Sequence, residues 1–463
     1  MATSDQVSPS PQSSDMTQDG SRGQGWLKWY NAEKGFGFIA RKSQPDLFFG
    51  RSAMECAIPY DDEPLSFEIG KDREGRDVAL RVRRQGVAAS GDIVEWRVDP
   101  GTHQGEGIIA PYLVGQPISF SGSDLVRMYS PKGKQVWPRP WYGANYLKVT
   151  LQDGTERAVE VKLDTRYPLQ RFAWLGVEEQ MIEDLRQRVL DENWDYRTSP
   201  SGKRNEILYN YIHFTFARLM EEDRGRAPAE RKIRIREDLK DHTPLAVFNT
   251  GLVDKRYESV YALFEPNDRG RSPRWKFMAF CIPGEDAGKL LSMYFNPLPM
   301  PARYFTSTSE LLYDPDAPLH PDYRHILTED RERLPKELLQ RVEGMDQVRA
   351  EKALKMYLDQ AIELARKRAR WNFKTAIPHY FPTLKRLDFL LPLCLLDDKT
   401  VNVALAVQRT ETGYLGNTIL PLDWAYKSAR LVCRPDSDWL APDRIDSASD
   451  PVTEDSDVGA PAV

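Results

Sequence analysis

Aromatic side chains recur between residues 25 and 50 in a pattern that favours short strands: GWLKWYNAEKGFGFIARKSQPDLFFG. Side chains two positions apart in a strand share a face, so Phe36 and Phe38 are expected to point the same way. Gly35 and Gly37 keep this strand slim beside the rings. Several of the rings alternate with Gly or Lys, at positions where a strand of a soluble protein normally has polar residues. The pattern therefore predicts a sheet that carries rings on a face reached by water.

Rings on a sheet, with cations beside them, suit single-stranded nucleic acid because bases stack on rings and phosphates attract cations. Each stacked base is worth about 1–3 kcal/mol. The alternative is that the rings only pack a core. The residues that we predict to bind nucleic acid are Lys28, Trp29, Tyr30, Lys34, Phe36, Phe38 and Phe48.

The stretch resembles the cold-shock domain, a five-stranded OB-fold barrel that binds single-stranded RNA and DNA. KGFGFI is similar to the first ribonucleoprotein motif of that family, DLFF to the second, and LSFEIG and GRDVALRV to its closing strands. The family usually has His after the second motif, often followed by another aromatic residue, where this sequence has Gly50 and Arg51. The resemblance therefore implies a binding surface that lacks one or two stacking positions.

A second β-like stretch follows, in which GDIVEWRVDPGTHQGEGIIA sets Trp96 and two glycines in an order like that of Trp29, Gly35 and Gly37. The ring positions would hold Glu106 and Ile108, which cannot stack on a base. Two interpretations remain open. The stretch is either a degenerate second OB-like barrel that serves as a spacer, or an unrelated β subdomain.

The C-terminal part mixes helical patterns, at 178–192, 206–223 and 346–371, with apolar strands. Segments such as NFKTAIPHYFP and TILPLDWAYKSARLV resemble a bacterial domain-of-unknown-function family that is found with nucleic-acid-binding modules. That resemblance implies an association and no chemistry. No phosphate-binding loop, nucleophile elbow or HExxH motif occurs. No catalytic residue can therefore be assigned, and neither a metal nor a cofactor is expected.

Cations and rings are interleaved in the stretch ARKRARWNFKTAIPHYFP, at the end of the longest predicted helix. Cations beside rings suit phosphates and bases. The helix dipole also favours Lys and Arg in a last turn, but it does not explain the aromatic residues beyond Pro378. A candidate second RNA surface therefore consists of Arg366, Arg368, Arg370, Trp371 and Lys374.

Both ends of the chain are polar and acidic, and we expect them to be disordered. They carry formal charges of −2 (1–24) and −5 (441–463), so residues 25–440 carry +2 within a total of −5. The acidic total is therefore no argument against nucleic acid. The four cysteines are far apart, and neither a signal peptide nor a membrane span is evident. These features indicate a cytoplasmic protein with no membrane partner.

Together these patterns predict a multidomain chain: an all-β OB-fold barrel, a second small β subdomain and a large α+β domain. The expected segments are 1–24 (tail), 25–86 (cold-shock domain), 87–165 (β-rich), 166–440 (α+β) and 441–463 (tail). The expected function is binding of single-stranded nucleic acid, RNA more than DNA, held beside the α+β domain. Protein partners cannot be assigned.

Two alternatives remain. The first is an enzyme of RNA processing, RNA repair or phage defence, with its active site in 166–440; the second is a non-enzymatic scaffold that binds another protein. A cleft that brings together Lys374, Arg430, Asp423 and His325 would favour the enzyme, and a flat apolar face would favour the scaffold.

Overall fold

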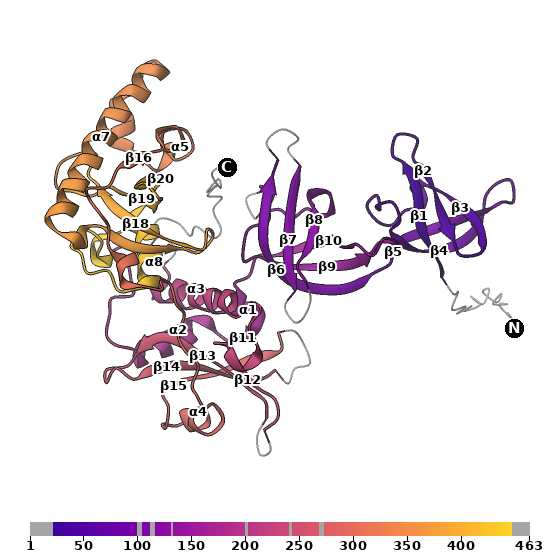
Figure 1. Cartoon of the computed structure of the whole chain (residues 1–463), viewed down its shortest axis with the longest axis horizontal. Helices are drawn as coiled ribbons and strands as arrows, with labels where there is room; N and C mark the ends of the chain where they lie inside the picture. The colour runs from indigo at the N-terminus through magenta and orange to yellow at the C-terminus, as the bar shows by residue number, and fades with distance from the viewer. Residues whose placement is uncertain are drawn as a thin grey trace, which may run out of the picture. The chain divides into compact units, whose positions relative to one another are not determined.

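The computed structural model describes residues 22–99, 104–111, 116–130, 133–199, 202–239, 243–267 and 273–446. The chain divides into two compact units, Met1–Asp164 and Thr165–Val463 (Figure 1). Most of the two tails, at 1–21 and 447–463, lies outside the described residues. Within the described part, no helix has the length and apolar character needed to cross a membrane.

Unit 1 begins with a closed barrel in the strand order β1-β2-β3-β5-β4. Its strands are β1 (Gly23–Asn31), β2 (Phe36–Arg41), β3 (Gln44–Gly50), β4 (Pro64–Lys71) and β5 (Asp77–Arg84). β3 and β5 are parallel, and all other neighbours are antiparallel. The predicted OB-fold barrel is confirmed.

The second β stretch is also a closed barrel, and its strand order, β6-β7-β8-β10-β9, repeats that of the first. Its strands are β6 (Val87–Val98), β7 (Gly105–Pro111), β8 (Ile118–Ser121), β9 (Gly143–Thr150) and β10 (Glu156–Asp164). β8 and β10 are parallel, as β3 and β5 are. The sequence left two interpretations open, and the structure shows a second OB-like barrel and not an unrelated β subdomain.

The first hairpins of the two barrels contain the same irregularity. In β1 the pairing with β2 shifts by one residue between Leu27 and Trp29. In β6 the pairing with β7 shifts in the same way between Ile93 and Glu95. Glu95 of the second barrel therefore occupies the place of Trp29 in the first.

The next residue of each strand packs inward on a ring. Tyr30 stacks on Phe49, with ring centroids 5.6 Å apart and planes at 18°. Trp96 stacks on Phe120 at 5.6 Å and 17°. The expected match of Trp96 with Trp29 is therefore wrong by one position, because Trp96 lies opposite Gly107 as Tyr30 lies opposite Gly37.

Unit 2 consists of two halves with one topology. The first half has α1 (Pro168–Phe172), α2 (Glu178–Arg188), α3 (Glu206–Glu222), α4 (Gly288–Tyr294), β11 (Ala173–Trp174), β12 (Arg234–Arg236), β13 (Leu245–Val253), β14 (Ser259–Pro266) and β15 (Trp275–Cys281). The second half has α5 (Tyr323–Thr328), α6 (Lys336–Arg341), α7 (Gln347–Trp371), α8 (Leu422–Val432), β16 (Leu319–Pro321), β17 (Ile377–Phe381), β18 (Arg386–Leu393), β19 (Val403–Arg409) and β20 (Tyr414–Leu420).

The two sheets of unit 2 have equivalent strand orders, β11-β15-β14-β13-β12 and β16-β20-β19-β18-β17. In each sheet, the strand that comes first in the chain runs parallel to the strand that comes last. β11 pairs with β15, with Ala173 opposite Trp275, and β16 pairs with β20, with Leu319 opposite Tyr414. In each, the last two strands of the meander share a register shift at the same relative place. The predicted α+β domain is confirmed, and its two halves repeat one sheet topology.

Each sheet of unit 2 is covered by a long helix on one face and a short terminal helix on the other. The apolar clusters join α3 to the first sheet, α4 to the opposite face of that sheet, and α7 to the second sheet. α8 packs on the second sheet and also on α3 (Figure 1). The layers therefore follow the order α4, sheet, α3, α8, sheet, α7, so that α3 is covered on two sides.

Candidate nucleic-acid interface

Four aromatic rings lie together on the outer face of the first barrel. The ring of Trp29 lies 5.5 Å from that of Phe36 and 5.2 Å from that of Phe38, measured between centroids. Phe48 lies 5.8 Å from Phe36 and 5.7 Å from Phe38. Trp29 is 39% exposed and Phe48 is 40% exposed. We call these four rings the aromatic platform.

Strand alternation explains the three phenylalanines of the platform. Leu47 and Phe49 are buried in the barrel core, and Phe48 between them points outward. Phe38 lies directly opposite Phe48 in the pairing of β2 with β3. The sequence positions of the core residues thus determine which rings reach water.

Trp29 reaches the platform because of the extra residue in β1. Leu27 is fully buried, and a regular strand would place Trp29 on the same inward face, two residues further on. The register shift between them instead sets Trp29 opposite Phe38. A bulge re-aims a side chain in this way. Tyr30 consequently lies apart from the platform and packs on Phe49.

Gly37 allows the backbone of β1 and the buried ring of Phe49 to lie close to β2. A Cβ at this position would lie 2.5 Å from the backbone oxygen of Trp29 and 3.0 Å from the ring of Phe49. Only glycine fits there without displacement of the backbone. Gly35 ends the turn between β1 and β2 with a φ of +70°, a conformation that glycine adopts readily.

The two predicted lysines lie beside the platform strands. Lys28 Nζ lies 2.6 Å from an oxygen of Asp46, and both side chains are exposed. Such an exposed ion pair contributes little to stability, so a phosphate can replace Asp46 at little cost. Lys34 is exposed and forms no ion pair with any residue that the structure describes. The same hairpin therefore presents both rings and cations.

The second barrel has a different surface on the equivalent face. Ile108 lies opposite Ser119 as Phe38 lies opposite Phe48. Glu95 and Glu106 take the places of Trp29 and Phe36. This face therefore carries two carboxylates and no ring at the four platform positions.

A buried cluster of charges links the two barrels of unit 1. Arg84, in β5, lies 3.3 Å from Glu63 and 3.3 Å from Asp124 of the second barrel. The Tyr60 hydroxyl donates a hydrogen bond of 2.6 Å to Asp124, and the guanidinium of Arg157 lies 4.7 Å from the Tyr60 ring. Burial raises the pKa of the Glu63 carboxyl, and the charge of Arg84 opposes that shift.

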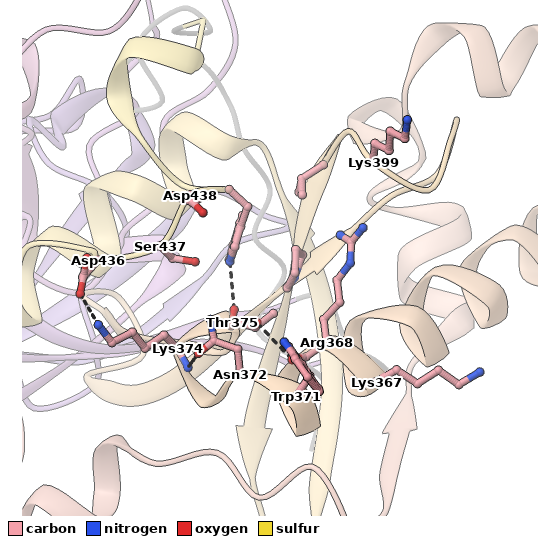
Figure 2. A pocket seen from close by; sticks show the side chains of 13 residues that line it. Lys367, Arg368, Trp371, Asn372, Lys374, Thr375, Lys399, Asp436, Ser437 and Asp438 are labelled. Carbon is pink, nitrogen blue, oxygen red and sulfur yellow. Dashed lines mark hydrogen bonds and ion pairs between the residues drawn. The ribbon is translucent and has the colours of Figure 1, made fainter.

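The residues of the candidate second RNA surface do not all lie together. The guanidinium of Arg366 donates to the backbone oxygen of Pro315, and that of Arg370 pairs with Asp316 at 2.8 Å. Three others, Arg368, Trp371 and Lys374, line an open pocket of about 680 Å³ (Figure 2). Three residues of the candidate surface therefore line one pocket. The other two, Arg366 and Arg370, instead contact the segment that contains Pro315 and Asp316.

Of the four residues whose convergence would favour an enzyme, three form separate pairs, and the backbone oxygen of Asp423 accepts a hydrogen bond from the Tyr196 hydroxyl. Lys374 pairs with Asp436, Arg430 with Glu192, and His325 lies 3.1 Å from Glu329. Within the described ranges, no group of three or more His, Cys, Asp and Glu side chains is arranged to hold a metal ion.

Comparison with known proteins identifies relatives of both units. A family described as a domain of unknown function (DUF3825) matches residues 185–439. Cold shock protein CspC of Bacillus subtilis (strain 168) is 56% identical over 59 residues, which are 12% of this chain and 89% of that protein. The major cold shock protein of Streptococcus pyogenes serotype M6 is 34% identical over 55 residues, 11% of this chain and 82% of that protein.

A solved structure described as drosophila Unr CSD456 aligns with 57% of this chain and 98% of its own length. The aligned residues are 10% identical, and the TM-score is 0.19. A score of this size carries no argument about the arrangement of the chain.

Proposed function

Because this chain belongs to the DUF3825 family and carries a cold-shock domain at its N-terminus, we propose that it binds single-stranded nucleic acid through the aromatic platform. The bases stack on Trp29, Phe36, Phe38 and Phe48, and Lys28 and Lys34 contact the phosphates. Each base that stacks on a ring contributes about 1–3 kcal/mol.

The second barrel supplies the observation that carries this proposal. It closes with the same strand order and the same shift in its first hairpin. At the platform positions, however, it has Glu95, Glu106, Ile108 and Ser119. The fold therefore does not require rings at these positions. Exposed rings that the fold does not need point to a ligand that stacks on them.

We propose RNA rather than DNA as the main ligand, bound in the cytoplasm. Sequence-specific and stacking contacts need unpaired bases, and RNA offers these in its loops and single strands. Unit 2 follows directly at Thr165, so a strand held by the platform stays at a raised local concentration near unit 2. This tethering accounts for a cold-shock domain and a DUF3825 domain in one chain.

The double variant Phe36→Ala/Phe38→Ala tests the platform. Its affinity for a fluorescently labelled oligouridylate, measured by anisotropy, is expected to fall by at least the roughly 1–3 kcal/mol of one stacked base. Both side chains are partly exposed, so calorimetry is expected to show that the barrel still folds. Tyr257→Ala removes an exposed ring in unit 2 and serves as the matched control, which should leave affinity unchanged.

A folded double variant that binds as tightly as the wild type would overturn the platform proposal. The preference for RNA is measured in the same assay by competition with the oligodeoxyribonucleotide of the same sequence. Equal competition by DNA and RNA would remove the preference and leave the platform proposal standing.

A further inference from the structure

The pocket in unit 2 lies where α7 ends and the chain turns back into β17. α7 ends at Trp371, and a short 3-10 helix, Phe373–Thr375, follows. The Trp439 indole nitrogen donates a hydrogen bond of 3.0 Å to the backbone oxygen of Thr375, which fixes the C-terminal segment against this helix. The pocket therefore has walls from three parts of the second half, including Lys399 of the loop between β18 and β19.

Trp371 is 93% exposed. Tryptophan is highly buried on average, and its indole faces contribute large stabilising areas when they are covered. Here the ring stands at the edge of the pocket (Figure 2). No structural role explains this exposure, because a ring with a structural role would be packed.

The charge in the pocket is positive on balance. Lys367, Arg368, Lys374 and Lys399 line it together with two carboxylates, Asp436 and Asp438. Arg368 is in the last turn of α7, where the helix dipole favours a cation. Lys374 and Lys399 lie beyond the helix, so the dipole does not account for them. Cations outside the helix, in a pocket that an exposed ring borders, suit phosphates and bases.

Lys374 is held by an acidic residue of its own chain. Its ammonium pairs with the carboxylate of Asp436, and this hydrogen bond lowers the pKa of Asp436. Both side chains are exposed. An ion pair in this setting contributes little, so a backbone phosphate, which carries the same single negative charge, can take the place of the carboxylate.

We propose that this pocket is a second binding site for single-stranded nucleic acid, in which a base stacks on Trp371 and a phosphate displaces Asp436 from Lys374. The site takes the same class of ligand as the aromatic platform, but its existence does not depend on the platform. Asp436 acts in it as an internal competitor that limits affinity.

The experiment uses the full chain with Phe36→Ala/Phe38→Ala, so that the remaining affinity reports the pocket. The probe is a labelled oligouridylate of about ten nucleotides. Adding Trp371→Ala is expected to weaken the remaining binding about fivefold or more. Because Trp371 is almost fully exposed, its replacement should leave the unfolding temperature unchanged.

Adding Asp436→Asn instead is expected to tighten binding several-fold, because Lys374 loses its competitor. Asp316→Asn is the matched control. It removes the same charge and frees Arg370, which does not line the pocket. An equal gain from Asp316→Asn and Asp436→Asn would mean that only net charge acts, and would overturn the proposal. So would unchanged binding by the Trp371→Ala variant.

The two proposals fail in different ways. If Phe36→Ala/Phe38→Ala has no effect and Trp371→Ala weakens binding in the otherwise wild-type chain, the platform proposal is wrong and the pocket stands. If Trp371→Ala has no effect in either background, the pocket proposal is wrong. The effect of Phe36→Ala/Phe38→Ala alone then decides the platform proposal.

Discussion

At the scale of single residues, Gly50 marks the place where the aromatic platform stops. It lies opposite Phe36 in the pairing of β2 with β3. Its backbone is extended, with φ at −98° and ψ at 166°. A Cβ there would contact only the Ser52 hydroxyl, at 4.0 Å. The position therefore accepts a side chain without strain, on the same face as the four rings.

Gly50→His is expected to tighten binding of the oligouridylate, because it adds a fifth ring beside Phe36. The gain should be within about 1–3 kcal/mol, the value of one stacked base, as measured by anisotropy at fixed salt. Gly50→Ala is the control, since it removes the backbone freedom of glycine without adding a ring. Equal affinities for the His and Ala variants would mean that the bound strand does not extend over this end of the platform.

At the scale of elements, hydrophobic periodicity predicted the long helices and buried strands well. The pattern at 346–371 became α7 (Gln347–Trp371), and the pattern at 206–223 became α3 (Glu206–Glu222). Both family resemblances are confirmed. Periodicity did not predict β16, which has three residues and is defined only by its pairing with β20.

The candidate sites show where sequence reasoning stops. Alternation and strand pairing bring together Phe36, Phe38 and Phe48, whereas Trp29 joins them only because of the bulge in β1. Tyr30 was predicted to bind nucleic acid, and the structure places it against Phe49, apart from the four rings, because alternation cannot foresee a bulge. Arg370 and Lys374 are close in the sequence, but they pair with distant carboxylates, Asp316 and Asp436. Only the tertiary structure shows which cation lines the pocket.

The junction between the two barrels gives a prediction about pH. Arg84→Met leaves two buried carboxylates, Glu63 and Asp124, without their cation. Breaking a buried pair costs about 3–5 kcal/mol, so calorimetry should show earlier unfolding of unit 1. Arg83→Met is the control, because the pair that Arg83 forms with Glu55 is exposed and worth at most about 1 kcal/mol.

The loss in the Arg84→Met variant should grow as the pH rises. Folding raises the pKa of Glu63, so the folded state binds this proton more tightly than the unfolded chain does. Stability then falls with rising pH, from the unfolded pKa of about 4.3 through the raised folded pKa. Removing Arg84 raises the folded pKa further and widens that window. A variant whose deficit is the same at about pH 5 and about pH 8 would contradict this account.

At the scale of the whole molecule, the two halves of unit 2 share one core. A single apolar cluster includes α3 and its sheet from the first half, and α8 with residues of β18 and β19 from the second. A buried ion pair crosses the same boundary, between Arg430 of α8 and Glu192, at 2.7 Å. The two halves are therefore expected to unfold together.

Arg430→Leu is expected to destabilise both halves, because it leaves Glu192 buried without its cation, at a cost of about 3–5 kcal/mol. Hydrogen exchange followed by mass spectrometry should show faster exchange in β13 and β14 as well as in β18 and β19. Arg349→Leu, which breaks an exposed pair with Asp346, should leave both regions protected. Faster exchange in the second half alone would mean that the halves are independent.

The position of α3 between its own sheet and α8 has a consequence for how the chain is made. No residue of α3 is exposed in the finished protein, whereas α7 at the other end of the stack has many exposed charged residues. Ribosomes add about 5–20 residues per second, and α8, which covers α3, comes much later in the chain. During that delay the nascent first half presents a bare apolar helix, which is the kind of surface that chaperones hold. A helix of the second half thus completes the first half.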